Sequence, residues 1–414
     1  MKPAIDVIGT EKCSSCFACY NACPFDAITM KLDKEGFYKP KIIRDNCIGC
    51  GICQKACPII NVNANNKENY RLERPIVYAG WSKDEISRIS SASGGIASEL
   101  AKYIIEEGGV VYGVIWDDSW HPTYIRVTRD NRDFLKYLKG SKYVPSFVGD
   151  VYKNVIVDLK NKRKVLFIGL PCHIAGLNNL ISLNKNEINS SNLSNLYTVD
   201  LICHGVPSIV IWDSYLQYIQ KKYGNKKIVE INMRDKSFGW DKPLLSIKFE
   251  NGEIYLAEFM TKDWFGWGFV NNYYLNNICY NCPFAKIPRQ GDITLGDFWG
   301  VPDELYNSKG ISLILVNSIK GMELIRDLKE SGKILLYRVD FEKILLEARE
   351  KNPRIVYGIL KKPKQREEII KIAQDRGFEE VIKILQKERI KNALYFVITH
   401  PIQALRIGLK LLMK

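Results

Sequence analysis

The sequence predicts an α/β protein, more closely an α+β one, with a small cysteine-rich domain, a mixed-sheet domain and a helical C-terminal tail. Two cysteine runs of the same spacing lie in the first sixty residues. Short apolar segments such as Val165–Gly169 lead into helical patterns further along, which is typical of strands buried in an α/β sheet. Apolar residues recur at helical spacing from Phe378 to Ile398. We therefore divide the chain into residues 1–62, 75–340 and 341–414.

The cysteine-rich domain is defined by the runs CSSCFACYNACP and CIGCGICQKACP. Each run reads C-x2-C-x2-C-x3-C-P, the ligand pattern of bacterial ferredoxins that hold two 4Fe–4S clusters. In that pattern the fourth cysteine of each run binds the cluster of the other run. We therefore expect a ferredoxin-like domain whose ligand sets are Cys13, Cys16, Cys19 and Cys57 for one cluster, and Cys47, Cys50, Cys53 and Cys23 for the other.

Zinc and disulfides are the alternatives for these cysteines. Zinc sites usually show paired C-x2-C units, and disulfide frameworks belong to small secreted chains. The chain opens with MKPAIDVIGTEKC, which is not an apolar signal segment, and it contains no run of eighteen apolar residues. Because cluster thiolates must stay reduced, we expect a cytoplasmic protein that carries electrons.

The second domain is expected to begin after a polar linker at residues 61–74, with a first strand at Pro75–Trp81. A helix is expected over residues 95–107, and it begins at Ser93, Gly94 and Gly95. Small residues at a helix N-terminus let a phosphate approach the backbone N–H groups. The alternative is an ordinary serine N-cap.

A pair of antiparallel strands at residues 109–116 and 124–128 follows, and then a basic loop, KGSKYVPS, which could equally be a solvated turn. A hairpin is expected over residues 245–257, and the aromatic segment 260–274 is expected to be helical.

Two apolar strands each end in a Cys-His pair. The strand at residues 165–169 delivers Cys172 and His173 to a strand-to-helix turn, and the strand at residues 196–202 delivers Cys203 and His204 in the same way. Binding sites form at such turns in α/β sheets. The alternative for each cysteine is a buried core thiol.

Four of the twelve cysteines lie outside the two runs. Two are Cys172 and Cys203, and the other two form the C-x2-C unit Cys279 and Cys282. All four lie in segments rich in Gly, Pro or His. Because the chain already carries clusters, a third 4Fe–4S cluster is the leading interpretation. Zinc, or a redox-active C-x2-C pair with two structural thiols, remain as alternatives.

Six motifs over residues 75–300 occur in the order SASGG, KGSKY, FIGLPCHIAGL, DLICHGVPS, MRDKSFGW and CYNCPFAKIPRQGDITLGDFWG. This set resembles the coenzyme F420 hydrogenase/dehydrogenase beta-subunit family, several members of which also carry the ferredoxin module. The resemblance implies a flavoprotein domain with FAD, and hydride exchange between FAD and an organic substrate. It also implies that Cys172, Cys203, Cys279 and Cys282 bind a cluster beside the flavin.

The resemblance further implies a set of cofactor and substrate contacts. The flavin would contact Ser93, Gly94, Gly95, Lys139, Gly140, Ser141, Lys142, Tyr143, Pro171, His173 and Ile174. Proposed catalytic residues are His173 and His204, which could relay protons because their ordinary pKa is near neutral, and Arg234 and Lys236, which with Lys142 could bind an anionic substrate tail. The two histidines could instead only orient the cluster turns. Coenzyme F420 and another two-electron substrate remain open.

The charge of the chain is uneven. The net charge is +14, and residues 351–414 alone carry 15 Lys and Arg against 6 Asp and Glu. This basic tail ends in Ile402–Lys414, a predicted amphipathic helix that could either pack on the domain or contact an anionic membrane surface. No nucleic-acid partner is expected, because most of the excess charge is in the tail.

Two functions of different classes fit these observations. The first is a flavin- and cluster-dependent oxidoreductase that exchanges electrons with a redox partner protein, such as a ferredoxin, hydrogenase or dehydrogenase subunit, and with a small-molecule substrate. The second is a non-catalytic subunit that relays electrons within a larger complex. Flavin content and turnover by the isolated chain distinguish them.

Overall fold

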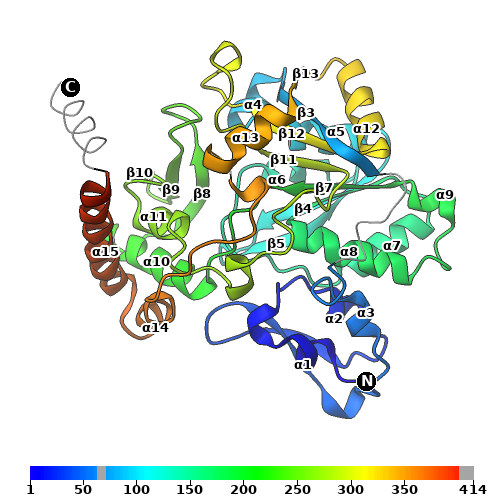
Figure 1. Cartoon of the computed structure of the whole chain (residues 1–414), viewed down its shortest axis with the longest axis horizontal. Helices are drawn as coiled ribbons and strands as arrows, with labels where there is room; N and C mark the ends of the chain where they lie inside the picture. The colour runs from blue at the N-terminus through cyan, green and yellow to red at the C-terminus, as the bar shows by residue number, and fades with distance from the viewer. Residues whose placement is uncertain (63–70, 352, 401–414) are drawn as a thin grey trace.

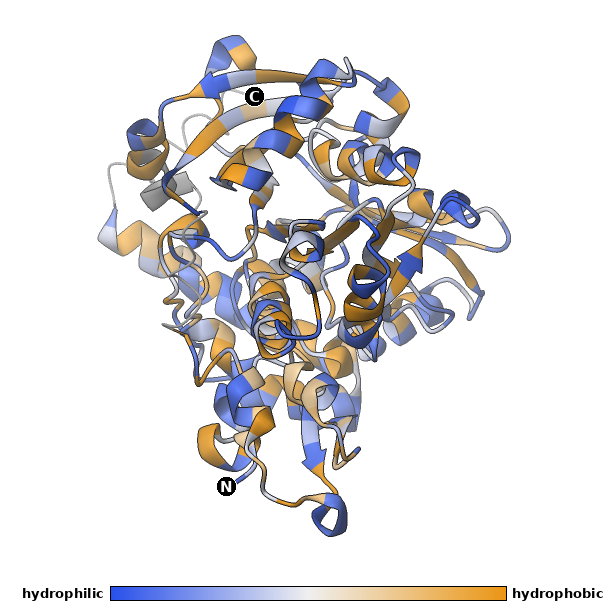
Figure 2. Cartoon of the chain, turned by 90° about the vertical axis from the view of Figure 1, so that its right-hand side faces the viewer, coloured by the Kyte–Doolittle hydropathy of each residue, from blue (hydrophilic) through white to orange (hydrophobic). Residues whose placement is uncertain are grey.

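The structure is a computed structural model that describes residues 1–62, 71–351 and 353–400 (Figure 1). An α/β body with a large mixed sheet carries the N-terminal domain at one end, and the C-terminal helices lie along one side. Figure 2 shows the N-terminal domain projecting from the body. This is the α/β architecture expected from the sequence.

The N-terminal domain has two similar halves. Helix α1 (Ala4–Ile8) precedes α2 (Ala18–Ala22), strands β1 (Ile28–Leu32) and β2 (Tyr38–Ile42) pair antiparallel, and α3 (Ile52–Ala56) follows. Short 3-10 turns η1 (Thr10–Lys12) and η2 (Arg44–Asn46) precede the two cysteine runs. The residues before α2 and α3 both have left-handed backbone, with φ of 64° at Phe17 and 78° at Gly51. The chain therefore turns sharply between the second and third cysteine of each run, and a short helix carries the third.

The main sheet has eight strands, and its four central strands β4, β6, β7 and β11 run parallel. The outer strands pair antiparallel with their neighbours. In spatial order the strands are β13 (Ile334–Val339), β3 (Arg71–Ser82), β12 (Ser312–Ser318), β11 (Ile293–Asp297), β7 (Leu196–Leu201), β6 (Val165–Gly169), β4 (Val110–Trp116) and β5 (Pro122–Val127). The carboxyl ends of the parallel strands meet at one edge, where sites form in such sheets.

Helices cover both faces of this sheet. On one face, α5 (Ile96–Glu106) and α12 (Ile319–Glu330) pack on side chains such as Val111 of β4. On the other, α7 (Val151–Lys160) and α8 (Pro171–Leu183) pack on neighbouring side chains such as Tyr112. The change of face between adjacent residues reflects the two-residue period of a strand. Smaller elements complete the body: α4 (Glu85–Ser90), η3 (Arg132–Phe134), α6 (Leu135–Leu138), α9 (Ser190–Leu193), η4 (Asn277–Tyr280) and η5 (Asp303–Leu305).

A second sheet forms the other half of the body. Strands β8 (Ile228–Asp235), β9 (Leu244–Phe249) and β10 (Ile254–Glu258) form an antiparallel meander that packs with α10 (Ile209–Lys222) and α11 (Trp264–Val270). The expected hairpin over residues 245–257 is therefore β9 and β10. The expected helix over residues 260–274 is shorter, because only Trp264–Val270 is helical.

The linker prediction also needs correction. Residues 71–74 belong to strand β3, which begins at Arg71 rather than at Pro75. The Arg71 guanidinium donates hydrogen bonds to the carbonyl oxygens of Arg289 and Gln290, at 2.7 and 2.5 Å. These bonds hold the polar start of the strand against a neighbouring loop.

The C-terminal region is less peripheral than the sequence suggests. After α13 (Phe341–Lys351) and η6 (Pro353–Ile355), helix α14 (Arg366–Arg376) and the first half of α15 (Phe378–Thr399) contribute buried residues to the core around α10, among them Ile369, Phe378 and Leu385. Only the outer part of α15, residues 389–399, is exposed throughout. The predicted helix at Ile402–Lys414 lies outside the described residues. Within the described ranges, no helix has the length and apolar character needed to cross a bilayer.

Candidate functional site

The eight cysteines of the N-terminal domain form two groups around two small cavities. One cavity is lined by Cys13, Cys16, Cys19 and Cys57. The other is lined by Cys23, Cys47, Cys50 and Cys53. These are the same two sets that the ferredoxin pattern predicts, because each fourth cysteine lies beside the first three of the other run. Soft thiolates in sets of four suit iron–sulfur clusters.

The remaining four cysteines converge from three segments. Cys172 is the second residue of α8, Cys203 follows β7, and Cys279 and Cys282 lie in and just after η4. Burial raises the pKa of Cys203 to about 11 and of Cys279 to about 12, and nearby thiols of the same group add to both effects. None of the four is in a disulfide. The structure therefore offers a third group of four thiols at the carboxyl edge of the parallel strands.

Arg354 closes this group from the C-terminal side. Its guanidinium donates to the carbonyl oxygen of Cys203 at 3.1 Å and to that of Cys279 at 3.4 Å. It also donates to Gly358 at 3.0 Å. The guanidinium charge lowers the pKa of both thiols, against the larger effect of burial. A cation in this place would favour the thiolate form that a metal cluster needs.

The segment that carries Arg354 also fits closely against the C-x2-C loop. The Cys282 amide donates to the Gly358 carbonyl at 2.8 Å, and the Leu360 amide donates to the Tyr280 carbonyl at 2.8 Å. A Cβ added at Gly358 would lie 2.1 Å from the Cys282 carbonyl oxygen, so only glycine fits there. Sequence reasoning missed this segment, because it lies some seventy residues beyond the cysteines and carries no cysteine itself.

A buried ion pair lies at the end of β7, next to Cys203. Arg289 and Asp200 lie 3.2 Å apart with fully buried side chains. The Arg289 guanidinium also donates to the carbonyl of Leu201, at the end of β7, at 3.0 Å. Breaking one partner of such a pair is strongly destabilising, because it leaves a buried charge alone. This pair therefore fixes the strand end that presents Cys203.

The N-terminal domain docks beside Cys172. The Tyr152 hydroxyl oxygen lies 2.9 Å from the Cys16 carbonyl oxygen and 3.0 Å from that of His173, so its one hydrogen is shared between acceptors in the two regions. Gly176 of α8 packs so closely on the domain that a Cβ there would lie 3.0 Å from the Ala18 Cβ and 3.4 Å from the Cys16 Sγ. The group containing Cys16 therefore lies nearer the third group than the one containing Cys47 does.

A cavity of about 280 Å³ adjoins the third group. This is near the lower end of the roughly 300–1,000 Å³ found for small-molecule pockets. Its lining includes Cys203 and His204. It also includes Ser93, Gly95 and the start of α5, and the loop from Lys139 to Tyr143. One cavity therefore brings a cysteine turn, a helix N-terminus and a basic loop together.

The cavity wall contains polar groups whose ionisation burial has changed. Burial lowers the pKa of Lys142 to about 7, and its amine donates to the Lys139 carbonyl at 3.2 Å. Burial also lowers the pKa of His204 to about 4, and the Arg354 charge acts in the same direction. Hydrogen bonds of His204 with the Asn272 side chain and the Phe269 backbone act against this lowering.

Several predicted flavin contacts do not line this cavity. The turn contributes Gly169 and Leu170 rather than Pro171 and Ile174. Gly94 faces the main sheet instead, since a Cβ there would lie 2.4 Å from the Gly80 carbonyl oxygen. Its role is therefore close packing of the helix start against β3.

His173 lies behind the cavity wall. It is buried, burial lowers its pKa to about 4, and its Nδ1 lies 3.0 Å from the hydroxyl of Tyr124, which does line the cavity. Any contact of His173 with a ligand would pass through Tyr124. An imidazole with so low a pKa is neutral at pH 7, so His173 and His204 fit hydrogen bonding better than a role as imidazolium.

Arg234 and Lys236 do not point into the cavity as the predicted anion-binding role requires. The Lys236 amine is held by the carbonyl oxygens of Arg88, Ser93 and Lys309, at 2.5–2.9 Å. Arg234 is buried and pairs with Asp297 at 2.9 Å, and Asp297 rather than Arg234 lines the cavity. The sequence motif gave the position of these cations but not their direction, and the structure makes them supports of the wall.

Comparison with known proteins identifies the family. The profile described as "Coenzyme F420 hydrogenase/dehydrogenase, beta subunit N-term" matches residues 77–153, and its C-terminus counterpart matches residues 162–340. Together they span more than half of the chain. A "4Fe-4S dicluster domain" profile matches residues 12–60. The first cysteine pattern is thereby confirmed as that of an iron–sulfur domain.

Three relatives show how far the similarity extends. The chain is 23% identical to a subunit of the F(420)H(2) dehydrogenase of Methanosarcina mazei, over 73% of this chain and 80% of that protein. It is 26% identical to the beta subunit of the F420-dependent formate dehydrogenase of Methanocaldococcus jannaschii, over 65% and 63%. It is 29% identical to the coenzyme F420-dependent sulfite reductase of that organism, over 42% of this chain and 26% of the relative.

A solved structure of the F420-reducing NiFe hydrogenase complex from Methanosarcina barkeri contains a similar chain, with 18% identity and a TM-score of 0.43, covering 79% of this chain and 95% of that one. The profile matches, which cover both the sheet domain and the cysteine domain, lead to one conclusion: this chain belongs to the coenzyme F420 hydrogenase/dehydrogenase beta-subunit family and carries a 4Fe–4S dicluster domain at its N-terminus.

Proposed function

We propose that this chain is an FAD-dependent iron–sulfur oxidoreductase that exchanges hydride with coenzyme F420 at the cavity beside Cys203. The observation that carries the proposal is the shared wall: Cys203, one of four converging thiols, lines the same cavity as the α5 N-terminus and the loop at Lys139 to Tyr143. A cluster there would lie directly beside whatever the cavity binds. The names of the relatives, which refer to F420, favour this substrate over others.

The cavity is lined by chemical groups of the kind that bind the phosphates of a flavin dinucleotide. The α5 N-terminus offers backbone N–H groups that favour phosphate, and Gly95, with φ of 87°, allows the turn before it. Lys142 lines the cavity, and its amine, whose pKa burial lowers to about 7, is charged when an anionic ligand is bound beside it. Bound FAD would supply the exchange between one-electron cluster chemistry and two-electron substrate chemistry.

The order of the thiol groups supports a single electron path. The group at Cys47 lies in the outer part of the N-terminal domain, the group at Cys16 lies against α8, and the third group adjoins the cavity. We propose that electrons pass along these groups between a redox partner protein and the cavity, with the partner docking at the exposed end near Cys50. In this proposal Cys172, Cys203, Cys279 and Cys282 bind the third cluster.

Two residues hold the cavity wall rather than react. Arg234, paired with Asp297 and 3.4 Å from the Tyr143 hydroxyl, fixes two wall side chains from behind. Lys236 ties the Ser93 carbonyl to the loop at Lys309, which orients the start of α5. A residue that only positions others should affect cofactor retention rather than the pH dependence of turnover.

The test is the cofactor content and activity of anaerobically purified protein. From the three four-cysteine groups we expect about twelve iron per chain. From the cavity we expect one FAD per chain. We also expect loss of F420 absorbance when dithionite-reduced protein is mixed with oxidised F420. An enzyme-free dithionite control corrects for direct reduction. Absent bleaching in protein with full iron and flavin would remove F420 as the substrate, while absent flavin would remove the flavoenzyme itself.

A non-catalytic relay is the second candidate, favoured by the chain of thiol groups alone. It predicts full iron content, no flavin, and electron transfer only when a partner subunit is present. Flavin analysis of the isolated chain therefore separates the two functions before any partner is identified.

A further inference from the structure

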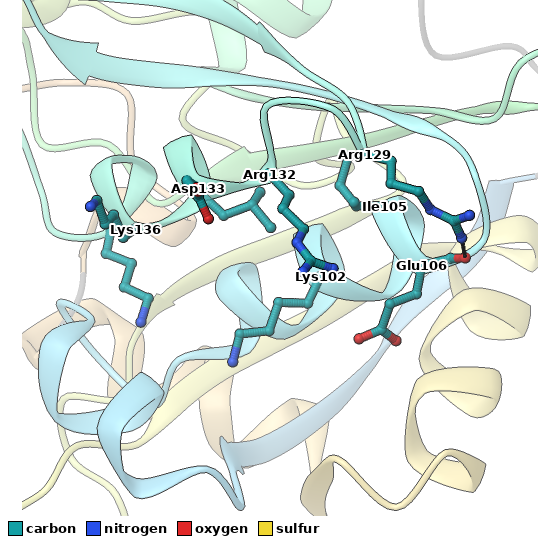
Figure 3. Close-up of a pocket in the computed structure, with 9 residues that line it drawn as sticks. Lys102, Ile105, Glu106, Arg129, Arg132, Asp133 and Lys136 are labelled. Carbon is teal, nitrogen blue, oxygen red and sulfur yellow. Dashed lines mark hydrogen bonds between the residues drawn. The ribbon is translucent and has the colours of Figure 1, made fainter.

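A second, strongly basic pocket lies on the surface beside the proposed flavin cavity. It has a volume of about 640 Å³ and lies between α5, η3 and α6 (Figure 3). Its apolar base includes Ile105 and Leu135. Five cations line it, namely Lys102, Arg129, Arg132, Lys136 and Lys139, together with the carboxylates of Glu106 and Asp133.

The charges in this pocket are not balanced by its own acids. Lys102 forms ion pairs with Asp84 and Glu99, and the Glu106 carboxylate forms one with Lys333. The charges of Lys102 and Glu106 are therefore balanced by residues that do not line the pocket. Arg129 donates to the Glu106 backbone carbonyl at 3.0 Å, a contact that leaves its charge in place. Of the ion pairs recorded in the described ranges, none involves the four remaining cations, which face one carboxylate, Asp133.

Lys139 joins this pocket to the proposed flavin cavity, because its side chain lines both. Its amine donates to the Ser90 hydroxyl at 3.0 Å. Burial lowers the pKa of Lys139, and the nearby charge of Lys102 adds to this. An anion bound between the two lysines would relieve their repulsion. A molecule with its ring in the cavity could therefore extend past Lys139 into the basic pocket.

We propose that the basic pocket binds the acidic tail, with its phosphate and carboxylate groups, of the substrate whose ring reacts in the cavity. The identity of that ring rests on the proposed function. The presence of an anion site does not. In this proposal the basic pocket takes the anion-binding role expected for Arg234 and Lys236, neither of which lines the cavity. Arg132 and Lys136 are the strongest candidates, because both are exposed and neither takes part in an ion pair recorded for the described chain.

The first experiment measures anion binding without turnover. Purified holoprotein is titrated calorimetrically with a short oligo-γ-glutamate peptide at low and high salt. We expect saturable binding that weakens with salt, since exposed charges are screened, and loss of binding in R132A/K136A. The matched control K371A/R376A removes one Lys and one Arg from exposed positions on α14 that line no recorded pocket of the described chain. Equal binding by both variants would overturn the proposal.

The second experiment asks whether the tail of the substrate uses the site. The KM for F420 is compared with that for the same deazaflavin ring lacking phosphate and carboxylates. For R132A/K136A we expect KM to rise about ten-fold for F420 only, which corresponds to about 1.4 kcal/mol for two exposed contacts, with kcat and FAD content unchanged. A variant that loses FAD, or that affects both substrates equally, would contradict the proposal. If no deazaflavin is reduced, the proposed function fails while the peptide titration still decides the anion site.

Discussion

Single side chains decide whether the third cysteine group can hold a cluster, and Cys282 is the clearest case. Replacing Cys282 by Ser substitutes a hard, weakly binding hydroxyl for a soft thiolate. We expect Cys282→Ser protein to lose about four of twelve iron atoms per chain while the N-terminal domain keeps eight. Iron analysis after anaerobic reconstitution measures this. Asn281→Ser changes the exposed neighbouring residue to the same side chain and should keep all iron. Wild-type iron content in Cys282→Ser would dismiss this ligand set.

Lys142 should make ligand binding in the cavity depend on pH. Burial lowers its pKa to about 7, so above pH 7 the free protein holds a neutral amine. A bound anionic ligand favours the charged form and raises this pKa, so binding takes up a proton and weakens as pH rises from 7 to 9. Below pH 7 the amine is already charged, and affinity should level off.

The measurement for Lys142 is FAD affinity of flavin-depleted protein, followed by flavin fluorescence between pH 6 and 9. Lys142→Met should bind weakly with no slope over this range. Lys142→Arg should stay charged and bind with little pH dependence. An unchanged slope in Lys142→Met would show that another group controls the titration.

At the scale of elements, the packing of α8 on α2 should determine electron transfer between the domains. In Gly176→Leu, the added side chain would meet Ala18 and the Cys16 sulfur at the contact where only a hydrogen fits now. We expect slower reduction of the cavity-side centres by an electron donor to the N-terminal domain, with all iron retained. Stopped-flow absorbance measures this rate. Ser182→Leu adds the same side chain at an exposed position of the same helix and checks for a general loss of stability. Equal rates for Gly176→Leu and wild type would contradict the proposed path.

The outer part of α15 exposes apolar residues next to basic ones. Leu394, Tyr395 and Ile398 are 59–76% exposed, and Lys387, Arg389 and Lys391 are also exposed. Apolar and aromatic side chains beside cations suit an anionic lipid surface. We expect the protein to co-sediment with anionic vesicles, and Leu394→Ser/Ile398→Ser to reduce this binding. Binding to neutral vesicles, or no difference between the variant and wild type, would remove the membrane role.

The sequence predicted those features that follow from local patterns. Cys172 and Cys203 were each expected at a turn after an apolar strand, and the structure places them after the parallel strands β6 and β7. The role of Arg354 was not predictable, since it depends on a long-range contact of a segment outside the motifs. The placement of the Lys236 amine on three backbone carbonyls, and of Gly94 against β3, was not predictable, because a motif does not tell which way a side chain points or what packs against a glycine.

At the scale of the whole molecule, Arg366 connects regions that are far apart in sequence. Its buried guanidinium pairs with Glu35 of the N-terminal domain at 2.8 Å and donates to the Leu275 carbonyl at 2.7 Å. Removing one partner of a buried pair costs roughly 3–5 kcal/mol. Because Glu35 is partly exposed, we expect a loss of about 2–3 kcal/mol in Arg366→Met.

Thermal unfolding of the holoprotein measures this loss as a lower Tm. Arg376→Met, at an exposed position at the end of the same helix, serves as the control. A Tm equal to that of the control would show that the domain and the C-terminal helices are held together by other contacts.

The segment at residues 353–360, which closes on the C-x2-C loop, has a consequence for biosynthesis. The first eight cysteines all lie within the first 57 residues, so the N-terminal domain can receive iron while the ribosome is still translating the rest. The last group cannot be enclosed until Arg354 and Gly358 have been synthesised and folded back. Metal insertion would then follow a fixed order, with the final cluster added late, and a truncated chain that ends before residue 353 should mature only to the eight-iron stage.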